Sequence, residues 1–374
     1  MASQLDFRPR KLHSMRTFLA SVVLIGTLGL SGCADLRYYM QSVGGHLQMM
    51  KAARPVEQWL GDANVTPDLK ARLVLAQRIR EFAVRELQLP DNASYLRYAD
   101  LQRRSVVWNV VAAPALSLKL KTWCFPVAGC VGYRGYFDEA QAHSEAQALQ
   151  ADGLEVSVYG VPAYSTLGWL NWAGGDPLLN TFIQYPEGEL ARMIFHELAH
   201  QVLYVKDDTV FNESFATAVE RLGAERWLAT YGSTAAEQAY AEFDGRRRQF
   251  RALTHATRHR LDAIYKDNQA VAQDPYAQLA MKNIAMTEFR QNYARLKESW
   301  SGYAGYDRWV AGANNAAFGA QAAYDELVPA FEALFVREGK DWRRFYDAVT
   351  RLARLPAVER ARALKPIPME LTRG

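Results

Sequence analysis

The spacing of hydrophobic residues divides the chain into a helical first part, a mixed middle and a long helical end. Between residues 35 and 89 apolar side chains recur every three or four positions, which is the period of a helix with one buried face. Short apolar runs replace this period between residues 94 and 185 and predict strands. From residue 187 onwards the helical period returns, with breaks only near glycines. The first helical period is carried by Ala71, Val74, Leu75 and Ile79.

The middle part is predicted to hold several short strands and one helix. The helix, rich in Ala and Gln, is predicted over Asp138–Ala151. A strand-like segment with glycines near its ends, Val161–Trp169, precedes the return of the helical period, and such an edge strand could pair with an extended peptide. The other strands are predicted at Val106–Val111, Leu116–Trp123, Val131–Tyr136 and Leu154–Tyr159.

The helical end is predicted to begin with two helices and to continue through a long hairpin that bends at Asp274-Pro275. Helices that flank a β-rich middle are typical of an α+β fold, here predominantly helical, rather than of a doubly wound α/β fold. We expect a single domain over residues 33–374. Its parts are N-terminal helices over 35–89, the β-rich part over 94–185, helices over 187–230, the helical hairpin over 235–300 and C-terminal helices over 306–374.

The composition is that of an ordinary globular protein, with 49% hydrophobic and 22% charged residues among 374. It excludes wholesale disorder, a collagen-like repeat and a disulfide-dense miniprotein. The formal net charge of +4 is concentrated at the front, where residues 1–32 hold four basic residues against one acidic residue. Without this segment the net charge falls to +1. The charge therefore gives little reason to expect a nucleic-acid partner.

The first 32 residues have the basic start, apolar run and small-residue cleavage site of a bacterial secretory signal. The apolar run, Phe18–Leu30, has 13 residues and is too short to span a bilayer, which needs about 20. The four residues that end at Cys33, Leu-Ser-Gly-Cys, resemble the lipobox of bacterial lipoproteins. This resemblance implies cleavage before Cys33 and acylation of that cysteine, and Ala34 favours the outer membrane. We expect a periplasm-facing lipoprotein of the bacterial outer membrane.

Two further cysteines, Cys124 and Cys130, remain for such an oxidising compartment. Pro126 and Gly129 between them can turn the chain, so a disulfide is the simplest use of the two thiols. A metal site with two thiolates is the alternative, although no histidine lies near them in the sequence.

The most specific chemical signal is His196-Glu197-Leu198-Ala199-His200 on a predicted helix over residues 187–205. Two histidines four positions apart leave one face of a helix one turn apart, so both can bind a single tetrahedral Zn²⁺ ion. Glu197 can reach water bound to that ion without being a ligand, which is the arrangement of zinc peptidases.

A third ligand is expected from the next helix, which follows a short turn and should pack antiparallel to the first. We predict Glu213, which has 12 residues between it and His200. Glu220 lies two turns further on the same face and is a candidate for supporting a ligand from behind, with a surface glutamate as the equal alternative. Tyr204 continues the histidine face and is a candidate donor to the oxyanion. Tyr303, Tyr306 and Tyr324 could serve similarly, although a structural role suits each of them better.

Asn212-Glu213-Ser214-Phe215-Ala216, downstream of the two histidines, resembles the gluzincin pattern. The likeness is to the alanyl-aminopeptidase and leukotriene-hydrolase families, whose second motif reads Asn-Glu-Gly-Phe-Ala with the glutamate on zinc. It implies a zincin-like catalytic core with a small β-sheet, in which the long hairpin is an insertion. Two features differ. Those families place 18 residues between the second histidine and the glutamate, and their Gly-Ala-Met-Glu-Asn element, which holds the substrate's free amine, is missing here.

Nearly the whole chain after residue 32 also resembles a bacterial lipoprotein family described as putative aminopeptidases. The resemblance rests on the two metal motifs and on three further stretches, and it implies zinc and peptide hydrolysis. The "amino" part rests on the family description alone. The three stretches are Trp123–Tyr136, Tyr164–Trp169 and Asn314-Asn315-Ala316.

The resulting hypothesis is a zinc-dependent peptide hydrolase, an aminopeptidase that acts on peptides in the cell envelope. His196, His200 and Glu213 hold Zn²⁺, and Glu197 takes a proton from zinc-bound water as it attacks the peptide carbonyl. One alternative is an endopeptidase or peptidoglycan-peptide amidase on the same zinc site. The other is a non-catalytic envelope scaffold or chaperone-like lipoprotein. The expected partners are a peptide substrate and a membrane, without nucleic acid.

A second histidine pair, His255 and His259, has the same spacing but no carboxylate between its members and lies in a basic segment. A solvated helix surface is the favoured interpretation. The run Arg246–Arg251 is interpreted in the same way, with anionic lipid headgroups as the alternative. His46 and His143 stand alone and are expected at surface or capping positions.

Overall fold

The computed structural model describes residues 37–125, 129–168, 171–266, 274–322 and 327–364. Within these ranges the chain is predominantly helical with small sheets, which confirms the predicted α+β class. The predicted export signal, Cys33 and Tyr324 lie outside the described residues. None of the described helices is both long enough and apolar enough to cross a membrane.

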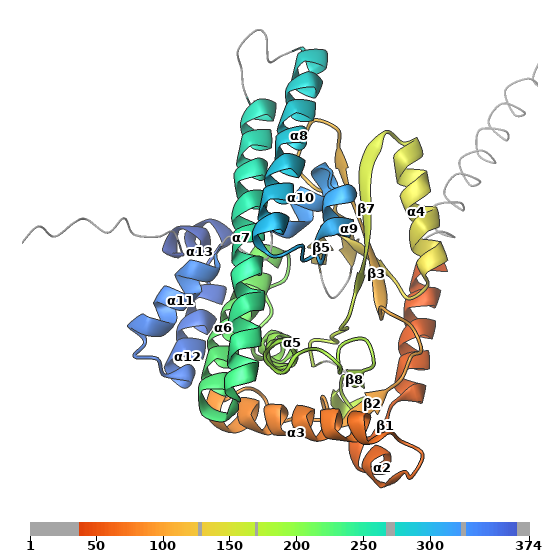
Figure 1. Cartoon of the computed structure of the whole chain (residues 1–374), viewed down its shortest axis with the longest axis vertical. Coiled ribbons are helices and arrows are strands. Elements are labelled where there is room, and N and C mark those ends of the chain that lie inside the picture. The colour runs from red at the N-terminus through yellow and green to blue at the C-terminus, as the bar shows by residue number, and fades with distance from the viewer. Residues whose placement is uncertain (1–36, 126–128, 169–170, 267–273, 323–326, 365–374) are drawn as a thin grey trace, which may run out of the picture.

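The elements follow the predicted order of a helical start, a β-rich middle and a helical end (Figure 1). A first helix runs through residues 37–52. The other helices are α2 (Val56–Gly61), α3 (Pro67–Leu87), α4 (Glu139–Ala151), the short 3₁₀ helix η1 (Asn171–Ala173), α5 (Glu187–Val202), α6 (Thr209–Tyr231), α7 (Thr234–Lys266), α8 (Pro275–Ser299), α9 (Asp307–Ala311), α10 (Asn315–Ala322), α11 (Val328–Arg337), α12 (Trp342–Ala353) and α13 (Ala357–Ala363). The strands are β1 (Arg54–Pro55), β2 (Arg97–Ala99), β3 (Val107–Pro114), β4 (Trp123–Phe125), β5 (Gly129–Val131), β6 (Arg134–Tyr136), β7 (Leu154–Val161) and β8 (Leu178–Leu179).

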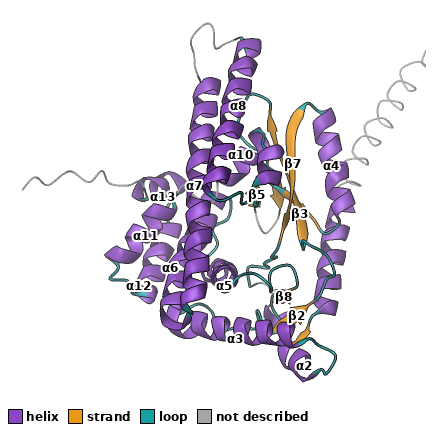
Figure 2. Cartoon of the chain, in the orientation of Figure 1, coloured by secondary structure: helices purple, strands orange, loops and turns teal. Residues whose placement is uncertain are grey.

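The main sheet is antiparallel in the order β6–β3–β7, and helices cover both of its faces (Figure 2). Successive residues of β3 point to opposite faces, as the alternation of a strand requires. Val110 and Ala112 are buried in a cluster with α4, whereas Val111 and Ala113 are buried against Ala316 of α10. A separate small sheet joins β1, β2 and β8, in which β2 and β8 run parallel.

The predicted strand Leu116–Trp123 is wrong except at its last residue, which begins β4. Pro114 ends β3, and the chain turns immediately afterwards. The Ser117 hydroxyl accepts a hydrogen bond from the Lys119 N–H at 3.1 Å. Such a local side-chain bond satisfies the backbone without a neighbouring strand.

Two other predicted strands are shorter than expected. Val131–Tyr136 is divided into β5 and β6. The predicted strand Val161–Trp169 is wrong after its first residue, because β7 ends at Val161 and residues 162–168 form a loop; Trp169 lies outside the described residues. The loop is held by Asp176, whose two carboxylate oxygens both accept from the Thr166 N–H at 3.1 Å.

The disulfide between Cys124 and Cys130 is present and joins β4 to β5, as predicted. The Cys130 N–H donates to the carboxylate of Asp207 at 2.6 Å. Gly129 has a φ of +76°, and a Cβ there would lie 2.3 Å from the same carboxylate. The disulfide hairpin is therefore seated against the turn between α5 and α6.

The main hydrophobic core surrounds α5 and α6. Phe195 of α5 packs against Phe82 of α3, with 6.0 Å between the ring centroids. Phe215 of α6 packs against Phe331 of α11 at 5.8 Å and Phe345 of α12 at 6.0 Å. Aromatic contacts on both sides thus fix the two helices.

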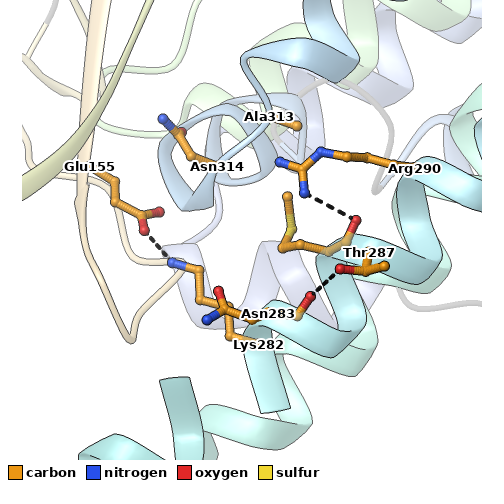
Figure 3. A pocket seen from close by; sticks show the side chains of 8 residues that line it. Glu155, Lys282, Asn283, Thr287, Arg290, Ala313 and Asn314 are labelled. Carbon is orange, nitrogen blue, oxygen red and sulfur yellow. Dashed lines mark hydrogen bonds and ion pairs between the residues drawn. The ribbon is translucent and has the colours of Figure 1, made fainter. Parts of the chain in front are cut away.

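The predicted hairpin is formed by α7 and α8, which rise side by side in Figure 1. Phe250 of α7 stacks on Tyr306 with 4.0 Å between the ring centroids. Lys282 of α8 is 5% exposed and pairs with Glu155 of β7 (Figure 3). It also donates to the Ala115 carbonyl at 2.8 Å. The hairpin is therefore attached to the main sheet by a charge pair whose lysine is buried.

Candidate metal centre

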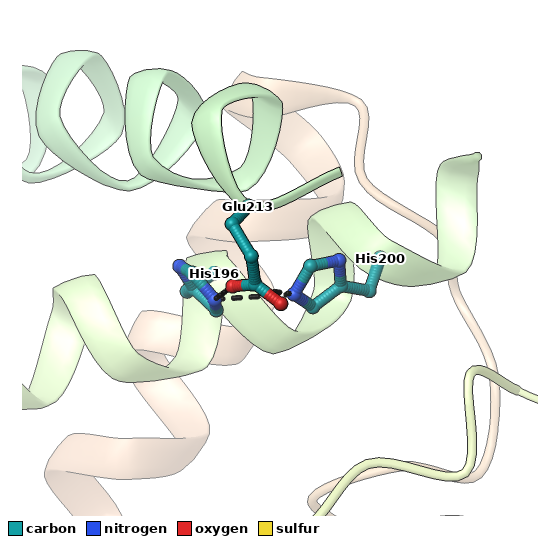
Figure 4. Close-up of side chains that lie close together, drawn as sticks. All are labelled: His196, His200 and Glu213. Atoms are coloured by element: carbon teal, nitrogen blue, oxygen red, sulfur yellow. Dashed lines mark hydrogen bonds and ion pairs between the residues drawn. The ribbon is translucent and has the colours of Figure 1, made fainter. Parts of the chain in front are cut away.

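Helix α5 presents two histidines whose rings converge. The helix begins after Pro186 and carries two glutamates in its first turn, as the positive end of the helix dipole favours. Ile194 and Leu198 are buried in the core. His196 and His200 project one turn apart, and their Nε2 atoms lie 3.1 Å from each other (Figure 4).

The turn between α5 and α6 is fixed by Asn212. Its Nδ2 donates to the Val205 carbonyl at 2.7 Å, and its Oδ1 accepts from the Val205 N–H at 2.8 Å. The carboxylate of Asp208 caps α6 by accepting from the Phe211 N–H at 3.1 Å. Because α6 begins so soon after α5 ends, Glu213 lies over the two imidazoles (Figure 4).

Glu213 and the two histidines have the separations expected of ligands to one ion. Glu213 Oε2 lies 3.3 Å from His196 Nε2 and 3.7 Å from His200 Nε2. Three atoms that each lie about 2.0–2.2 Å from a tetrahedral ion are about 3.3–3.6 Å from one another. Two imidazole nitrogens and one carboxylate oxygen are also the donor set of a catalytic zinc site. The three residues therefore fit Zn²⁺, and no other group of this kind occurs among the described residues.

Glu220, two turns after Glu213, supports His196 from behind. Its Oε2 lies 2.9 Å from His196 Nδ1, the ring nitrogen that faces away from Glu213 and His200. Burial opposes a charge on His196, but hydrogen bonds to Glu213 and Glu220 raise the pKa of His196 well above its usual value. A carboxylate in this position holds the orientation and tautomer of a ligand histidine.

Arg192 stabilises the charge of Glu220. Burial favours the neutral carboxyl, but Arg192 and then His196 lower the pKa of Glu220 to about 2. The Arg192 guanidinium also lies 3.5 Å from the carboxylate of Asp244 in α7 and 4.0 Å from that of Glu189. Its side chain is 5% exposed. Arg247 of α7 pairs with Glu189 and lies 4.0 Å from Asp244. We call these five residues the buried ionic array: Arg192, Glu220, Asp244, Glu189 and Arg247.

Glu197 has no hydrogen-bond or ion-pair partner among the described residues. Burial raises its pKa, the charges of His196 and His200 lower it, and the carboxylates of Glu213 and Asp176 raise it again, so that the net shift is upward. Its side chain is only partly buried by the protein. A carboxylate in this state can accept a proton from a group beside it.

A buried polar network close to Glu197 is not predicted from the sequence. Asp176 is 1% exposed and accepts from Gln201 Nε2 at 3.4 Å. Gln201 also donates to the Ser94 hydroxyl at 3.1 Å and accepts from Asn92 Nδ2 at 2.7 Å. These bonds fix the end of α5 to two loops. A glutamine directly after the second histidine is the one sequence signal that could have revealed the network.

Three tyrosines lie close enough to Glu213 for its charge to affect them. Burial, and after it the charge of Glu213, raises the pKa of Tyr133 and of the predicted Tyr204. Burial and the charge of Glu213 also raise the pKa of Tyr159 of β7 to about 12, although a hydrogen bond with Asn109 lowers it. All three hydroxyls therefore remain protonated donors at neutral pH. In the sequence, only the alternation of residues between the two faces of a strand could have distinguished Tyr159 among the 19 tyrosines.

The other candidates from the sequence have different surroundings. His255 and His259 lie on an exposed face with 3.2 Å between their Nε2 atoms. No carboxylate completes a metal group with them in the described part of the chain. The interpretation of Arg246–Arg251 as a solvated face is wrong for Arg247, because the ionic array buries it.

His46 is not at the surface position expected of it. Its ring packs against Tyr164 with 5.9 Å between centroids, and its Nδ1 is buried. His143 is exposed, as expected, and lies 4.0 Å from Glu139. Tyr303 and Tyr306 pack together in the aromatic cluster at the base of the hairpin, where they have a structural role.

The comparisons with known proteins give one match. A family model described as "Putative aminopeptidase" matches residues 37–364, which is most of the chain and includes both helices of the candidate metal centre. No curated protein and no solved structure matches the chain.

Substitution of Arg192 by methionine should lower the free energy of unfolding by about 3–5 kcal/mol, because it leaves buried carboxylates without their cation. Urea unfolding measures this change. Arg226→Met is the matched control, since Arg226 of α6 pairs with Glu86 of α3 at the surface and both side chains are more than 40% exposed. The control should lose no more than about 1 kcal/mol. Equal losses in the two variants would contradict a stabilising role for the array.

Proposed function

The chain belongs to the Putative aminopeptidase family, and on this premise we propose that it is a zinc-dependent aminopeptidase. The observation that carries the proposal is the convergence of His196, His200 and Glu213 beside the unpaired carboxylate of Glu197. Export and lipid anchoring through Cys33 at the outer membrane belong to the same proposal and are supported by the composition of residues 1–33. The substrates would then be peptides of the cell envelope.

His196, His200 and Glu213 would hold the zinc ion. Bound there, zinc would supply a Lewis acid that polarises a peptide carbonyl and makes water more acidic. Glu220, itself paired with Arg192, would keep the ring of His196 oriented for such a ligand role.

Glu197 is the proposed general base. Its carboxylate accepts a proton from the attacking water and delivers that proton to the nitrogen of the leaving amine. The upward shift of its pKa brings it nearer to neutral pH, which favours both transfers. No described residue pairs with this carboxylate, which leaves it available for water and substrate.

Tyr133, Tyr159 and Tyr204 are the proposed sources of a donor to the carbonyl oxygen. A tetrahedral oxyanion is stabilised by a fixed hydrogen-bond donor, and a protonated phenol is such a donor. Tyr159 lies in β7, Tyr133 in the connection between β5 and β6, and Tyr204 just after the end of α5, so the three come from different parts of the chain. Substitution of each by phenylalanine would identify the donor through a loss in kcat.

A substrate profile tests the proposed function. The purified protein should bind about one equivalent of zinc and hydrolyse peptides with a free amino terminus, but not the same peptides after N-acetylation. Chelation should abolish the activity, and added zinc should restore it. Cleavage of acetylated peptides would instead indicate an endopeptidase or amidase. Bound zinc without any hydrolysis would favour a scaffold.

Two substitutions separate metal binding from proton transfer. Glu213→Ala should lose about one equivalent of zinc because it removes a ligand. Glu197→Gln should keep the zinc but lose about 10²- to 10⁴-fold in kcat, because an amide cannot act as a base. Metal analysis and peptide hydrolysis measure the two effects. Glu225→Gln, at an exposed position of α6, is the matched control and should change neither. Full activity of Glu197→Gln with bound zinc would show that the base is assigned wrongly.

Zinc binding at pH 7 should release about one proton. The raised pKa of His196 keeps its ring protonated in the metal-free protein, and a ligand histidine must be neutral. The apparent zinc affinity should therefore fall about tenfold for each pH unit below that pKa. Calorimetry in two buffers of different ionisation enthalpy measures the released proton. Glu220→Gln should reduce the release, because it removes one of the carboxylates that hold the proton on His196.

A further inference from the structure

A cavity away from the metal centre is lined by arginines. It has a volume of about 410 Å³ and is bordered by α6, α7, α10 and the start of α11. The arginines are Arg221 of α6 and Arg248, Arg251 and Arg258 of α7. The described residues that line the cavity include no carboxylate. Since the chain after residue 32 is almost neutral, this is a local concentration of positive charge.

Three of the four arginines have interactions within the protein, Arg251 among them, and Arg258 is the exception among the described residues. Arg221 lies 3.3 Å from Glu332, and Arg248 lies 3.4 Å from Asp244. Asp244 is shared, because it also contacts the arginines of the buried ionic array. Arg258 has no hydrogen bond or ion pair with any described residue, and its Nε is buried. A buried guanidinium donor without an acceptor is unfavourable, so an anion in the cavity would be stabilised.

The remainder of the lining is apolar. Phe318 of α10 is 1% exposed, and Val328 and Pro329 begin α11. The cavity therefore offers guanidinium groups and a hydrophobic wall to the same occupant. Guanidinium groups bind the oxygens of phosphate and carboxylate groups in pairs, while an apolar wall removes a hydrocarbon body from water.

The cavity is separate from the place where a peptide would meet Glu197. Glu220 and Arg221 are consecutive on α6, and consecutive helix residues point about 100° apart. Glu220 contacts His196 of α5, whereas Arg221 contacts Glu332 of α11. Occupancy of the cavity therefore does not require the proposed peptidase activity.

We propose that this cavity is a binding site for an anionic amphiphile, a small molecule with an oxyanion head group on an apolar body. The arginines bind the head group, with Arg258 as the donor that lacks a partner among the described residues. Phe318, Val328 and Pro329 contact the apolar body. The basic segment of α7 thus has a specific ligand-binding role in addition to its part in the ionic array.

Calorimetric titration of the purified protein with hexyl phosphate tests the proposal. We expect saturable binding of one equivalent, at least tenfold tighter than that of inorganic phosphate because of the hexyl chain. Hexylamine has the same chain with the opposite charge and should not bind. Hexanoate distinguishes the head groups: competition by hexanoate indicates a carboxylate ligand, and its failure to compete indicates a phosphate ligand.

Arg258→Gln should weaken the binding of hexyl phosphate at least tenfold, and Arg248→Gln should also weaken it. The Arg248 side chain is 65% exposed, so its replacement does not threaten folding. Arg260→Gln is the matched control, because Arg260 lies on the same helix but pairs with Glu288 of α8 outside the cavity. Thermal melting without ligand verifies that each variant is folded. Wild-type binding by folded Arg258→Gln and Arg248→Gln, or equal binding of hexyl phosphate and inorganic phosphate, would overturn the proposal.

Discussion

The structure around the candidate metal centre depends on the burial of carboxylates between α5, α6 and α7. Glu213 and Glu220 project from α6 into a region from which water is largely excluded, and a buried carboxylate needs a cation beside it. His196 of α5 and Arg192 supply the positive charge, and Asp244 and Arg247 extend the array to α7. Each charge is fixed by another helix, so the three helices cannot shift independently.

This constraint explains why the hydrophobic core is arranged around the same helices. Phe195 and Phe215 lie close in the chain to the charged residues and pack outwards against α3, α11 and α12. Each of the two helices therefore has a charged side that meets its neighbour and an apolar side that meets the core. Glu197 is the exception, since it has neither a partner among the described residues nor full burial. Glu213 and Glu220 are both paired, whereas this carboxylate remains available for chemistry.

The sequence predicts what depends on local spacing and misses what depends on distant partners. The helical period and the four-residue spacing of His196 and His200 are local, and so is the short turn that brings Glu213 nearby. Arg192 lies within the same helical pattern as its neighbours, but its partner Asp244 is 52 residues away. Nothing in the local sequence therefore reveals that Arg192 is buried. The strand predicted at Leu116–Trp123 fails for a different, local reason, because a hydrogen bond of a turn outweighs its apolar pattern.

The short separation of His200 and Glu213 in the sequence follows from the contacts made by the residues on either side of Glu213. Asn212 binds both backbone groups of Val205, which closes the turn within a few residues and fixes the start of α6. Ser214 accepts from the Leu327 N–H at 3.2 Å, and Phe215 enters the core against α11. The side chains of Asn212, Ser214 and Phe215, which flank Glu213, are thus fixed to the turn, the start of α11 and the core. A longer connection between the helices is unnecessary because the motif itself determines where its glutamate lies.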